Sequence, residues 1–153
     1  MRVLALDLAS TTGWAITPDE SGIWSIAPRR GDSPGMRYIN LRSRLELVRA
    51  AHPDLDLVVY EAAHHRGGAA TEYALGNAAT VQAWCAENRI HHTSVHTGTL
   101  KKFATGKGNS EKPAMIAEAR RRWPWVEILS DDHADALLLL AYADAVLLGP
   151  PTQ

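Results

Sequence analysis

The sequence predicts a single α/β domain over residues 1–153, with a mixed five-stranded sheet and helices on both faces. Three observations support this class. Three short strand patterns, joined by short turns, open the chain and are typical of an antiparallel meander. Strand and helix patterns then alternate, which indicates parallel strands connected by helices. With 153 residues and 46% apolar content, the chain is long enough for one well-buried domain and too short for two ordinary ones.

The individual elements follow from the spacing of apolar residues along the chain. The predicted strands cover residues 2–8, 13–17, 22–26, 55–61 and 92–95. The predicted helices cover residues 39–51, 70–87, 111–122 and a last segment that begins near 130. His52-Pro53 ends the first helix because proline disfavours helical backbone in the residue before it, and Ser110 is the expected cap of the third.

Cysteine content and hydropathy exclude several classes of protein. Cys85 is the only cysteine, which excludes an internal disulfide and a cysteine-based zinc site and favours a buried structural thiol. No run of about 18 apolar residues spans a bilayer, and the N-terminus opens on a strand pattern in place of a signal peptide. We therefore expect no membrane association and a cytoplasmic protein.

Charge is unevenly distributed although the net charge is only −1. Residues 101–123 hold seven Lys or Arg against two Glu, whereas residues 124–153 hold five acids and no Lys or Arg. A basic rim beside an acidic pocket suits a metal-dependent enzyme that acts on a polyanion, because the bases hold phosphates while the acids hold ions. For Arg120-Arg121-Arg122 alone, the favoured interpretation is a solvated helix face and not a phosphate-binding rim.

Four acids suggest a metal site. Asp7 and Glu61 each end an apolar strand pattern, and Asp132 and Asp135 lie three apart, on one face of the last helix. Carboxylates gathered in a partly buried place need a positive charge, which Mg²⁺ supplies as a hard ion that prefers oxygen ligands. Acids in the first turn of a helix are also favoured by its dipole, so Asp131 or any single member of this group has a purely structural alternative.

These patterns occur in a specific order. The relevant segments are Leu4-Ala5-Leu6-Asp7 with Thr12-Gly13-Trp14-Ala15, the strand ending in Glu61, Ala74-Leu75-Gly76-Asn77-Ala78, residues 101–112 with their lysines and Gly106-Lys107-Gly108, and Asp132-His133-Ala134-Asp135-Ala136-Leu137. Together they resemble the RuvC family of Holliday junction resolvases, which have the RNase H-like (retroviral integrase) fold, and the short chain is similar to compact phage-encoded members. A phage-encoded protein would act in the host cytoplasm.

The resemblance implies a homodimeric endonuclease that resolves four-way or branched DNA and leaves 5′-phosphate and 3′-hydroxyl ends. It implies two Mg²⁺ ions, with Mn²⁺ as a substitute, held by Asp7, Glu61, Asp132 and Asp135, and it puts Lys101 and Lys112 near the scissile phosphate. The residues expected to contact DNA are Lys101, Lys102, Lys107, Lys112, His64, His65 and Arg66. The residues expected at the dimer interface are Tyr73, Leu75, Gly76, Ala79 and Ala83.

Several alternatives stay open at this point. A related nuclease for RNA or RNA/DNA hybrids, a non-catalytic DNA-binding module, and an actin-like ATPase suggested by residues 7–13 are the rival functions; the last lacks the chain length for a second lobe. Residues 64–68 are equally well read as a surface turn. His133 is expected beside the ligands or exposed, without a ligand role. Trp84, Trp123 and Trp125 are expected to pack against helices more than to stack on bases.

Overall fold

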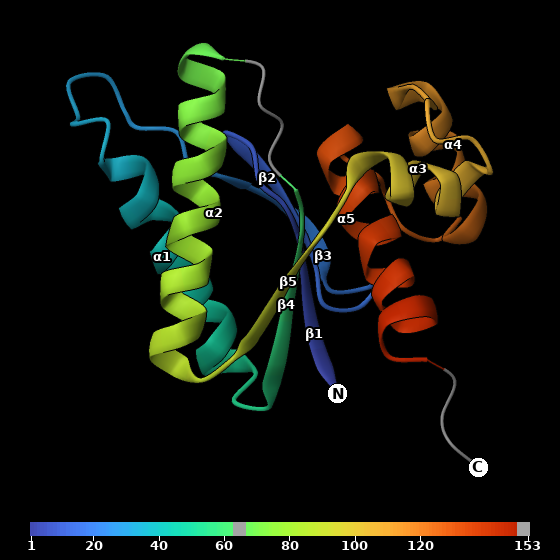
Figure 1. Cartoon of the computed structure of the whole chain (residues 1–153), viewed down its shortest axis with the longest axis horizontal. Coiled ribbons are helices and arrows are strands. Elements are labelled where there is room, and N and C mark those ends of the chain that lie inside the picture. Colours follow the sequence, from blue (N-terminus) through green and yellow to red (C-terminus); the bar gives the residue numbers. More distant parts are fainter. Residues whose placement is uncertain (63–66, 150–153) are drawn as a thin grey trace.

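A computed structural model of the chain describes residues 1–62 and 67–149, and it confirms the mixed five-stranded sheet with helices on both faces (Figure 1). The strands are β1 (Arg2–Asp7), β2 (Thr11–Ala15), β3 (Ser21–Ser25), β4 (Leu55–Glu61) and β5 (His91–Val95). Their order across the sheet is β3-β2-β1-β4-β5. The first three strands pair antiparallel, whereas β1, β4 and β5 run parallel, so β1, β3, β4 and β5 all end at the same edge.

The helices form one layer on each side of the sheet. They are α1 (Met36–Ala51), α2 (Gly68–Asn88), α3 (Thr97–Thr105), α4 (Lys112–Arg122), α5 (Asp131–Tyr142) and a short π-helical segment η1 (Ala143–Leu147). In Figure 1, α1 and α2 lie on one side of the sheet, and α3, α4 and α5 lie on the other. Of the three helices on that second side, α5 packs directly on the central strands, and its buried stretch includes four consecutive leucines.

Alternation of side chains along the central strands builds two cores. Val3, Ala5, Leu57 and Val59 face the leucines of α5, whereas Leu4, Leu6, Val58 and Tyr60 face α1 and α2. Because side chains alternate between faces with a period of two, the residues that end β1 and β4 belong to the α5 face. The two acids of the predicted site therefore begin on the same side of the sheet.

Two local predictions were wrong. Helix α3 was not expected, since its nine residues include Gly98 and three threonines, which are weak helix formers. It forms because His96 caps it, accepting a hydrogen bond from the Gly98 N–H at 3.1 Å, and because Leu100 and Ala104 are buried on one side. Ser110 does not cap α4: its hydroxyl donates to the Lys107 carbonyl at 2.8 Å and pairs with Thr105, which closes the loop between α3 and α4.

The remaining expectations concern single residues. Cys85 is a buried free thiol, and burial raises its pKa to about 12. Trp84 is fully buried and Trp123 packs against the core, as predicted, but Trp125 is 65% exposed and its indole N–H donates to Asp19. Arg121 and Arg122 pair with Glu118 on the surface of α4, which confirms a solvated helix face. Across residues 1–62 and 67–149, every helix is too short or too polar to cross a membrane.

Candidate metal centre

The strand half of the site is fixed by the parallel pairing of β1 and β4. Leu6 lies opposite Tyr60 in this ladder, so Asp7 and Glu61 follow at the same level at the carboxyl ends of their strands. Both side chains point to the α5 face, as the alternation along each strand requires. The main-chain ladder alone brings these two acids together.

The helix half depends on close contact between β2 and the start of α5. Gly13 lies opposite Asp7 in the β1–β2 ladder, and a Cβ atom built there would lie 1.8 Å from the Asp132 carbonyl oxygen. No side chain fits between this strand and the helix, so glycine is the residue that permits α5 to approach. A strand-interior glycine commonly marks such a close approach of backbone. Through this contact Asp132 and Asp135 reach the strand acids.

His133 fixes the same turn of the helix from the other side. The side chain is 2% exposed, its Nδ1 accepts a hydrogen bond from the Leu129 N–H at 3.1 Å, and its Nε2 lies 2.8 Å from the Ser21 hydroxyl. Since Nδ1 accepts and the Ser21 hydroxyl donates to the Pro18 carbonyl, Nε2 carries the proton. His133 therefore ties α5 to the start of β3. The alternative of an exposed His133 was wrong, because the ring is buried and both of its nitrogens are hydrogen-bonded.

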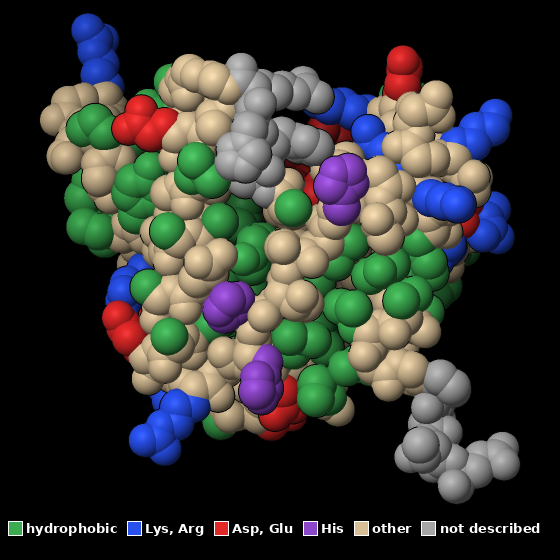
Figure 2. All heavy atoms as spheres, viewed as in Figure 1, with side chains coloured by type: hydrophobic (Ala, Val, Ile, Leu, Met, Phe, Trp, Pro, Cys, Tyr) green, Lys and Arg blue, Asp and Glu red, His purple; other side chains and the backbone are tan. Residues whose placement is uncertain are grey.

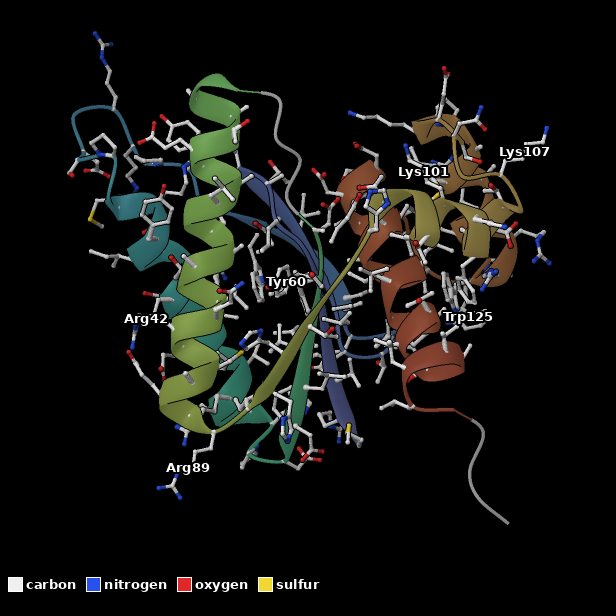
Figure 3. The ribbon with its side chains drawn as sticks, viewed as in Figure 1. Arg42, Tyr60, Arg89, Lys101, Lys107 and Trp125 are labelled. Atoms are coloured by element: carbon white, nitrogen blue, oxygen red, sulfur yellow. The ribbon has the colours of Figure 1, made fainter. Side chains whose placement is uncertain are left out.

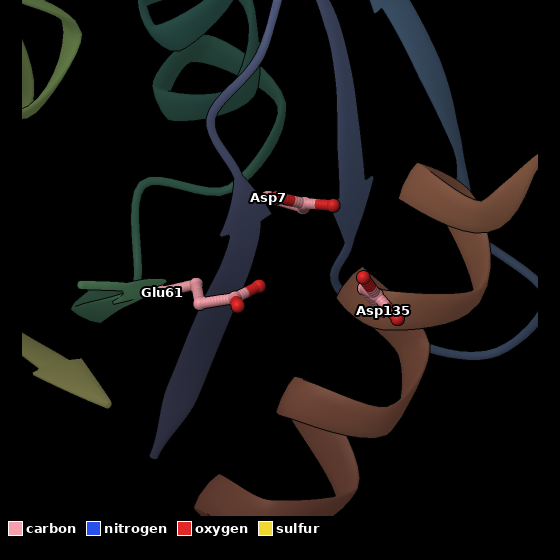
Figure 4. A group of neighbouring side chains, drawn as sticks. All are labelled: Asp7, Glu61 and Asp135. Atoms are coloured by element: carbon pink, nitrogen blue, oxygen red, sulfur yellow. The ribbon is translucent and has the colours of Figure 1, made fainter. Parts of the chain in front are cut away.

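Three of the four predicted acids converge. Each of Asp7, Glu61 and Asp135 places one carboxylate oxygen within 4.8 Å of the others, and the three side chains point toward one another in Figure 4. Oδ1 of Asp135 is buried and has no hydrogen-bond partner among the described residues. A buried oxygen without a donor is costly unless a cation binds it. This oxygen and its two carboxylate neighbours fit a hard divalent ion.

Asp132, the fourth predicted ligand, is partly buried and contacts this group through a side-chain hydrogen bond with Asp7. Its charge reaches both Asp7 and Asp135, as the pKa values of those residues reveal, yet it is not one of the three with oxygens within 4.8 Å. Ser130 caps the helix by accepting a hydrogen bond from the His133 N–H at 3.2 Å, and the helix begins near residue 130 as predicted. The first turn of α5 thus carries both Asp132, in contact with Asp7, and Asp135.

The acids perturb one another strongly. Burial, followed by the charges of Glu61, Asp135 and Asp132, raises the pKa of Asp7 well above its usual range. Burial and the charge of Glu61 raise the pKa of Asp135 to about 7, while Lys101 opposes this shift. Carboxyl groups that resist ionisation at neutral pH signal missing positive charge, which a divalent cation would supply.

Lysines border the acids on the side of α3 and α4. Lys112, at the start of α4, forms an ion pair with Asp131 at 3.3 Å, and its pKa is raised by Asp131 first and also by Asp132 and Asp135. Figure 3 places Lys101 on the side of α3 nearer the sheet and Lys107 at the outer edge. Lys102 is exposed on α3. Lys101 and Lys112 therefore lie beside the acids, and Lys107 lies farther out.

Thr97 supports the strand half and was missed from the sequence. Its hydroxyl donates to Oε1 of Glu61 at 2.5 Å. Thr97 opens α3 two residues after Val95, which lies opposite Glu61 in the β4–β5 ladder. A threonine shortly after a predicted strand was the available signal, but its meaning depends on the unpredicted helix α3.

Other predicted residues fall outside the centre. His64, His65 and Arg66 lie outside the described residues. Of the residues expected at a dimer interface, Leu75, Ala79 and Ala83 are exposed at successive turns of α2. The other two contact α1 of the same chain: Arg37 stacks over the Tyr73 ring at 4.1 Å, and a Cβ at Gly76 would lie 2.3 Å from the Tyr38 hydroxyl.

Comparison with solved structures identifies the fold. A Thermus thermophilus RuvC structure superposes with a TM-score of 0.72 and 14% identity, covering 94% of this chain and 96% of that one. T. thermophilus RuvC in complex with a Holliday junction substrate superposes with a TM-score of 0.71 and 16% identity, covering 91% of this chain and 90% of that one. The yeast mitochondrial Holliday junction resolvase Ydc2 superposes with a TM-score of 0.60 and 16% identity, covering 90% of this chain and 75% of that one. No protein-family model and no curated protein sequence matches. The chain therefore has the RNase H-like fold of RuvC.

Proposed function

We propose that this chain, with the fold of RuvC, is a metal-dependent endonuclease that cuts four-way or branched DNA and leaves 5′-phosphate and 3′-hydroxyl ends. The observation that carries the proposal is the convergence of Asp7, Glu61 and Asp135, with a buried Asp135 oxygen that lacks a donor. Solved structures with the same fold include a RuvC bound to a Holliday junction substrate. The proposal places the enzyme in the cytoplasm, where it meets its DNA.

In this proposal Asp7, Glu61 and Asp135 hold Mg²⁺ or Mn²⁺, and Asp132 completes the set beside Asp7. The bound ions supply an activated water and neutralise charge on the phosphate. Thr97 orients Glu61 through the 2.5 Å hydrogen bond. Gly13 and His133 hold the first turn of α5 at the distance the acids require.

The lysines act on the DNA side. Lys101 and Lys112 lie beside the acids, where an ammonium group offsets the negative charge of a phosphate that approaches the centre. Asp131 holds Lys112 in place through the ion pair at 3.3 Å. Lys102 and Lys107 extend this basic region outward. We also propose that His64, His65 and Arg66 contact DNA.

Two opposed cuts on a junction require two centres, so we propose a homodimer formed through α2. Leu75, Ala79 and Ala83 supply exposed apolar surface next to Ile39, which is 56% exposed on α1. Between α1 and α2 lies a groove of about 380 Å³ that Ala79 and Ala83 line. Tyr73 and Gly76 support this surface by fixing α1 against α2.

The test is cleavage of a synthetic four-way junction with and without Mg²⁺, beside a linear duplex and an RNA/DNA hybrid. We expect Mg²⁺-dependent nicking of the junction in preference to both. The Asp7→Asn variant should lose cleavage by at least about 10³-fold while binding the junction as well or better, since it removes a negative charge. Preferred cleavage of the hybrid would identify the RNA-directed rival, and binding without cleavage would identify a DNA-binding module.

A further inference from the structure

The segment that joins β3 to α1, together with the first half of α1, carries an excess of positive charge that the proposed centre does not use. Residues 29–44 hold five arginines and a single acid, Asp32. Arg29, Arg30 and Arg44 are exposed, and no carboxylate in residues 1–62 or 67–149 lies within 4.0 Å of their guanidinium groups. Unpaired guanidinium groups clustered on one surface favour an anionic partner.

Two of these arginines line one polar hollow. The hollow has a volume of about 580 Å³, and its lining includes Arg29, Arg44, Ser25 and Asn40. The carboxylate of Asp32 also faces it but accepts a hydrogen bond from the Arg29 main-chain N–H at 3.0 Å, which closes the turn. With two cations and one carboxylate engaged in a turn, the hollow offers hydrogen-bond donors to phosphate groups.

The hollow lies at the same edge of the sheet as the acids, but it is lined by α1, which covers the face opposite the one that carries the acids. β3 runs parallel to β1 in direction, so Ser25 ends its strand at the edge where Asp7 and Glu61 end theirs. The Ile26 N–H donates to the Ser10 carbonyl at 3.0 Å, which joins the start of this segment to the loop after Asp7. Arg37 reaches the same loop: it donates to the Ser10 hydroxyl at 2.7 Å, is 7% exposed, and has a buried Nε without a partner among the described residues.

The second basic region, with Lys101, follows β5 at the opposite margin of the sheet. β3 and β5 are four strand spacings apart, which is about 19 Å at roughly 4.8 Å per spacing. Such a distance corresponds to about five or six base pairs at roughly 3.4 Å each. Figure 2 shows Lys and Arg side chains at both upper corners, over the segment before α1 and over α3 and α4.

We infer that the hollow lined by Arg29 and Arg44 binds backbone phosphates of a DNA strand that extends from the acidic centre, so that DNA is held on both sides of the cut. This inference rests on the proposed nuclease function and adds a contact surface to it. The hollow stays free in the proposed dimer, because it lies on the Met36, Asn40 and Arg44 side of α1, whereas the groove toward α2 is lined by Tyr38, Ile39 and Arg42.

The test measures junction affinity of the full chain against salt concentration, in the absence of divalent cations. Each lost phosphate contact reduces the magnitude of the negative slope of log K against log salt by about 1. Arg29→Gln/Arg44→Gln should therefore reduce this magnitude by about 2. The matched control is Arg49→Gln/Arg89→Gln, which removes the same charge from two exposed arginines at the opposite end of the sheet. Figure 3 shows Arg89 at that end, far from Lys101. The control slope should stay within about 0.5 of the wild-type slope.

Cleavage separates this inference from the function on which it rests. With Mg²⁺ and saturating protein, the control Arg49→Gln/Arg89→Gln should cut bound junction at the wild-type rate, because neither residue belongs to the acidic centre or to the hollow. If the wild-type protein cuts the junction but the two double variants have equal salt slopes, the phosphate site is contradicted and the nuclease function is supported. If Arg29→Gln/Arg44→Gln shows the predicted slope change but the wild-type protein never cuts the junction, the phosphate site is supported and the nuclease function is contradicted. If the wild type does not bind the junction at all, both proposals fall.

Discussion

The two halves of the acidic centre are positioned by different physical means. Asp7 and Glu61 stand at the ends of two neighbouring parallel strands, where main-chain pairing fixes their level and their face. Asp132 and Asp135 stand on α5, whose position depends on side-chain and backbone contacts with β2 and β3. The strand half therefore belongs to the sheet itself, whereas the helix half has to be docked onto it.

This difference predicts which substitutions should disturb the acidic centre. A pleated ladder tolerates many side-chain changes, because its hydrogen bonds are between main-chain groups. A docked helix instead depends on a few close contacts, and small displacements of a catalytic group have large kinetic effects. We therefore expect substitutions remote from the acids to matter more on the α5 side than on the strand side.

The strongest test of this comparison is Gly13→Ala. The added methyl group would lie 1.8 Å from the Asp132 carbonyl, so the first turn of α5 has to move away from β2. We expect a loss of about 1–3 kcal/mol in the free energy of unfolding and a loss of about 10²-fold or more in junction cleavage. Thermal unfolding and single-turnover cleavage measure the two effects.

Gly22→Ala is the matched control, since Gly22 lies on β3 opposite Trp14, the neighbour of Gly13. Its added Cβ would lie 3.3 Å from the indole ring of Trp14 and would not meet backbone atoms. Cleavage by this variant should stay within about threefold of wild type, as expected of a change outside the centre. Equal losses for Gly13→Ala and Gly22→Ala would show that α5 is not the sensitive half.

His133→Ala should have the next largest effect. It removes the link between the Leu129 N–H and the Ser21 hydroxyl, and unsatisfied buried groups cost about 1–3 kcal/mol. We expect cleavage to fall by about 10- to 30-fold, because the turn that carries Asp132 loses its anchor. His133→Asn keeps an acceptor for the Leu129 N–H and should recover part of the loss. A general-base role for His133 would instead give no recovery with Asn and an altered pH–rate profile.

These contacts also explain how far the sequence could predict the site. The position of Asp7 and Glu61 follows from two apolar strand patterns with a period of two, which is a local signal. The pairing of Asp132 with Asp135 follows from helical spacing, also local. The docking of α5 joins Gly13 to Asp132 and Ser21 to His133, residues more than 100 positions apart, and no local pattern encodes such a contact.

Helix α3 was missed for the opposite reason. Its local signal is weak because Gly98 and threonines disfavour helix, and packing of Leu100 and Ala104 against the core outweighs that preference. The role of Thr97 was lost with the helix that positions it. The proposed role of Arg29, which precedes α1, and of Arg44, which lies in α1, could not be predicted from the sequence, because it depends on the sheet placing Ser25 and Asp7 at the same edge.

A third prediction concerns pH. Because the pKa of Asp135 is raised to about 7 in the folded chain, from a value near 3.8 when unfolded, the folded state binds more protons between these values. Metal-free stability should therefore fall as pH rises from about 4 to about 7. Asp135→Asn should remove part of this dependence and raise the metal-free Tm at pH 8 by about 3–6 °C, for about 1–2 kcal/mol in a partly buried group. Differential scanning fluorimetry in EDTA measures the Tm of both proteins against pH. A pH dependence of the Tm that is the same in Asp135→Asn as in the wild type would contradict this prediction.

The smallest effect is expected on the strand side, from Thr97→Val. This variant keeps the shape of the side chain and removes the hydroxyl that donates to Glu61 at 2.5 Å. The β4 main chain still places Glu61 beside Asp7, so the acid loses an orienting hydrogen bond but not its position. We expect cleavage to fall only about three- to tenfold, in line with roughly 0.5–1.5 kcal/mol for one hydrogen bond. Thr97→Ser, which restores the donor, should be close to wild type in the same single-turnover assay. A loss as large as that of Gly13→Ala would mean that the ladder alone does not hold Glu61, and that the strand half is docked in the same sense as the helix half.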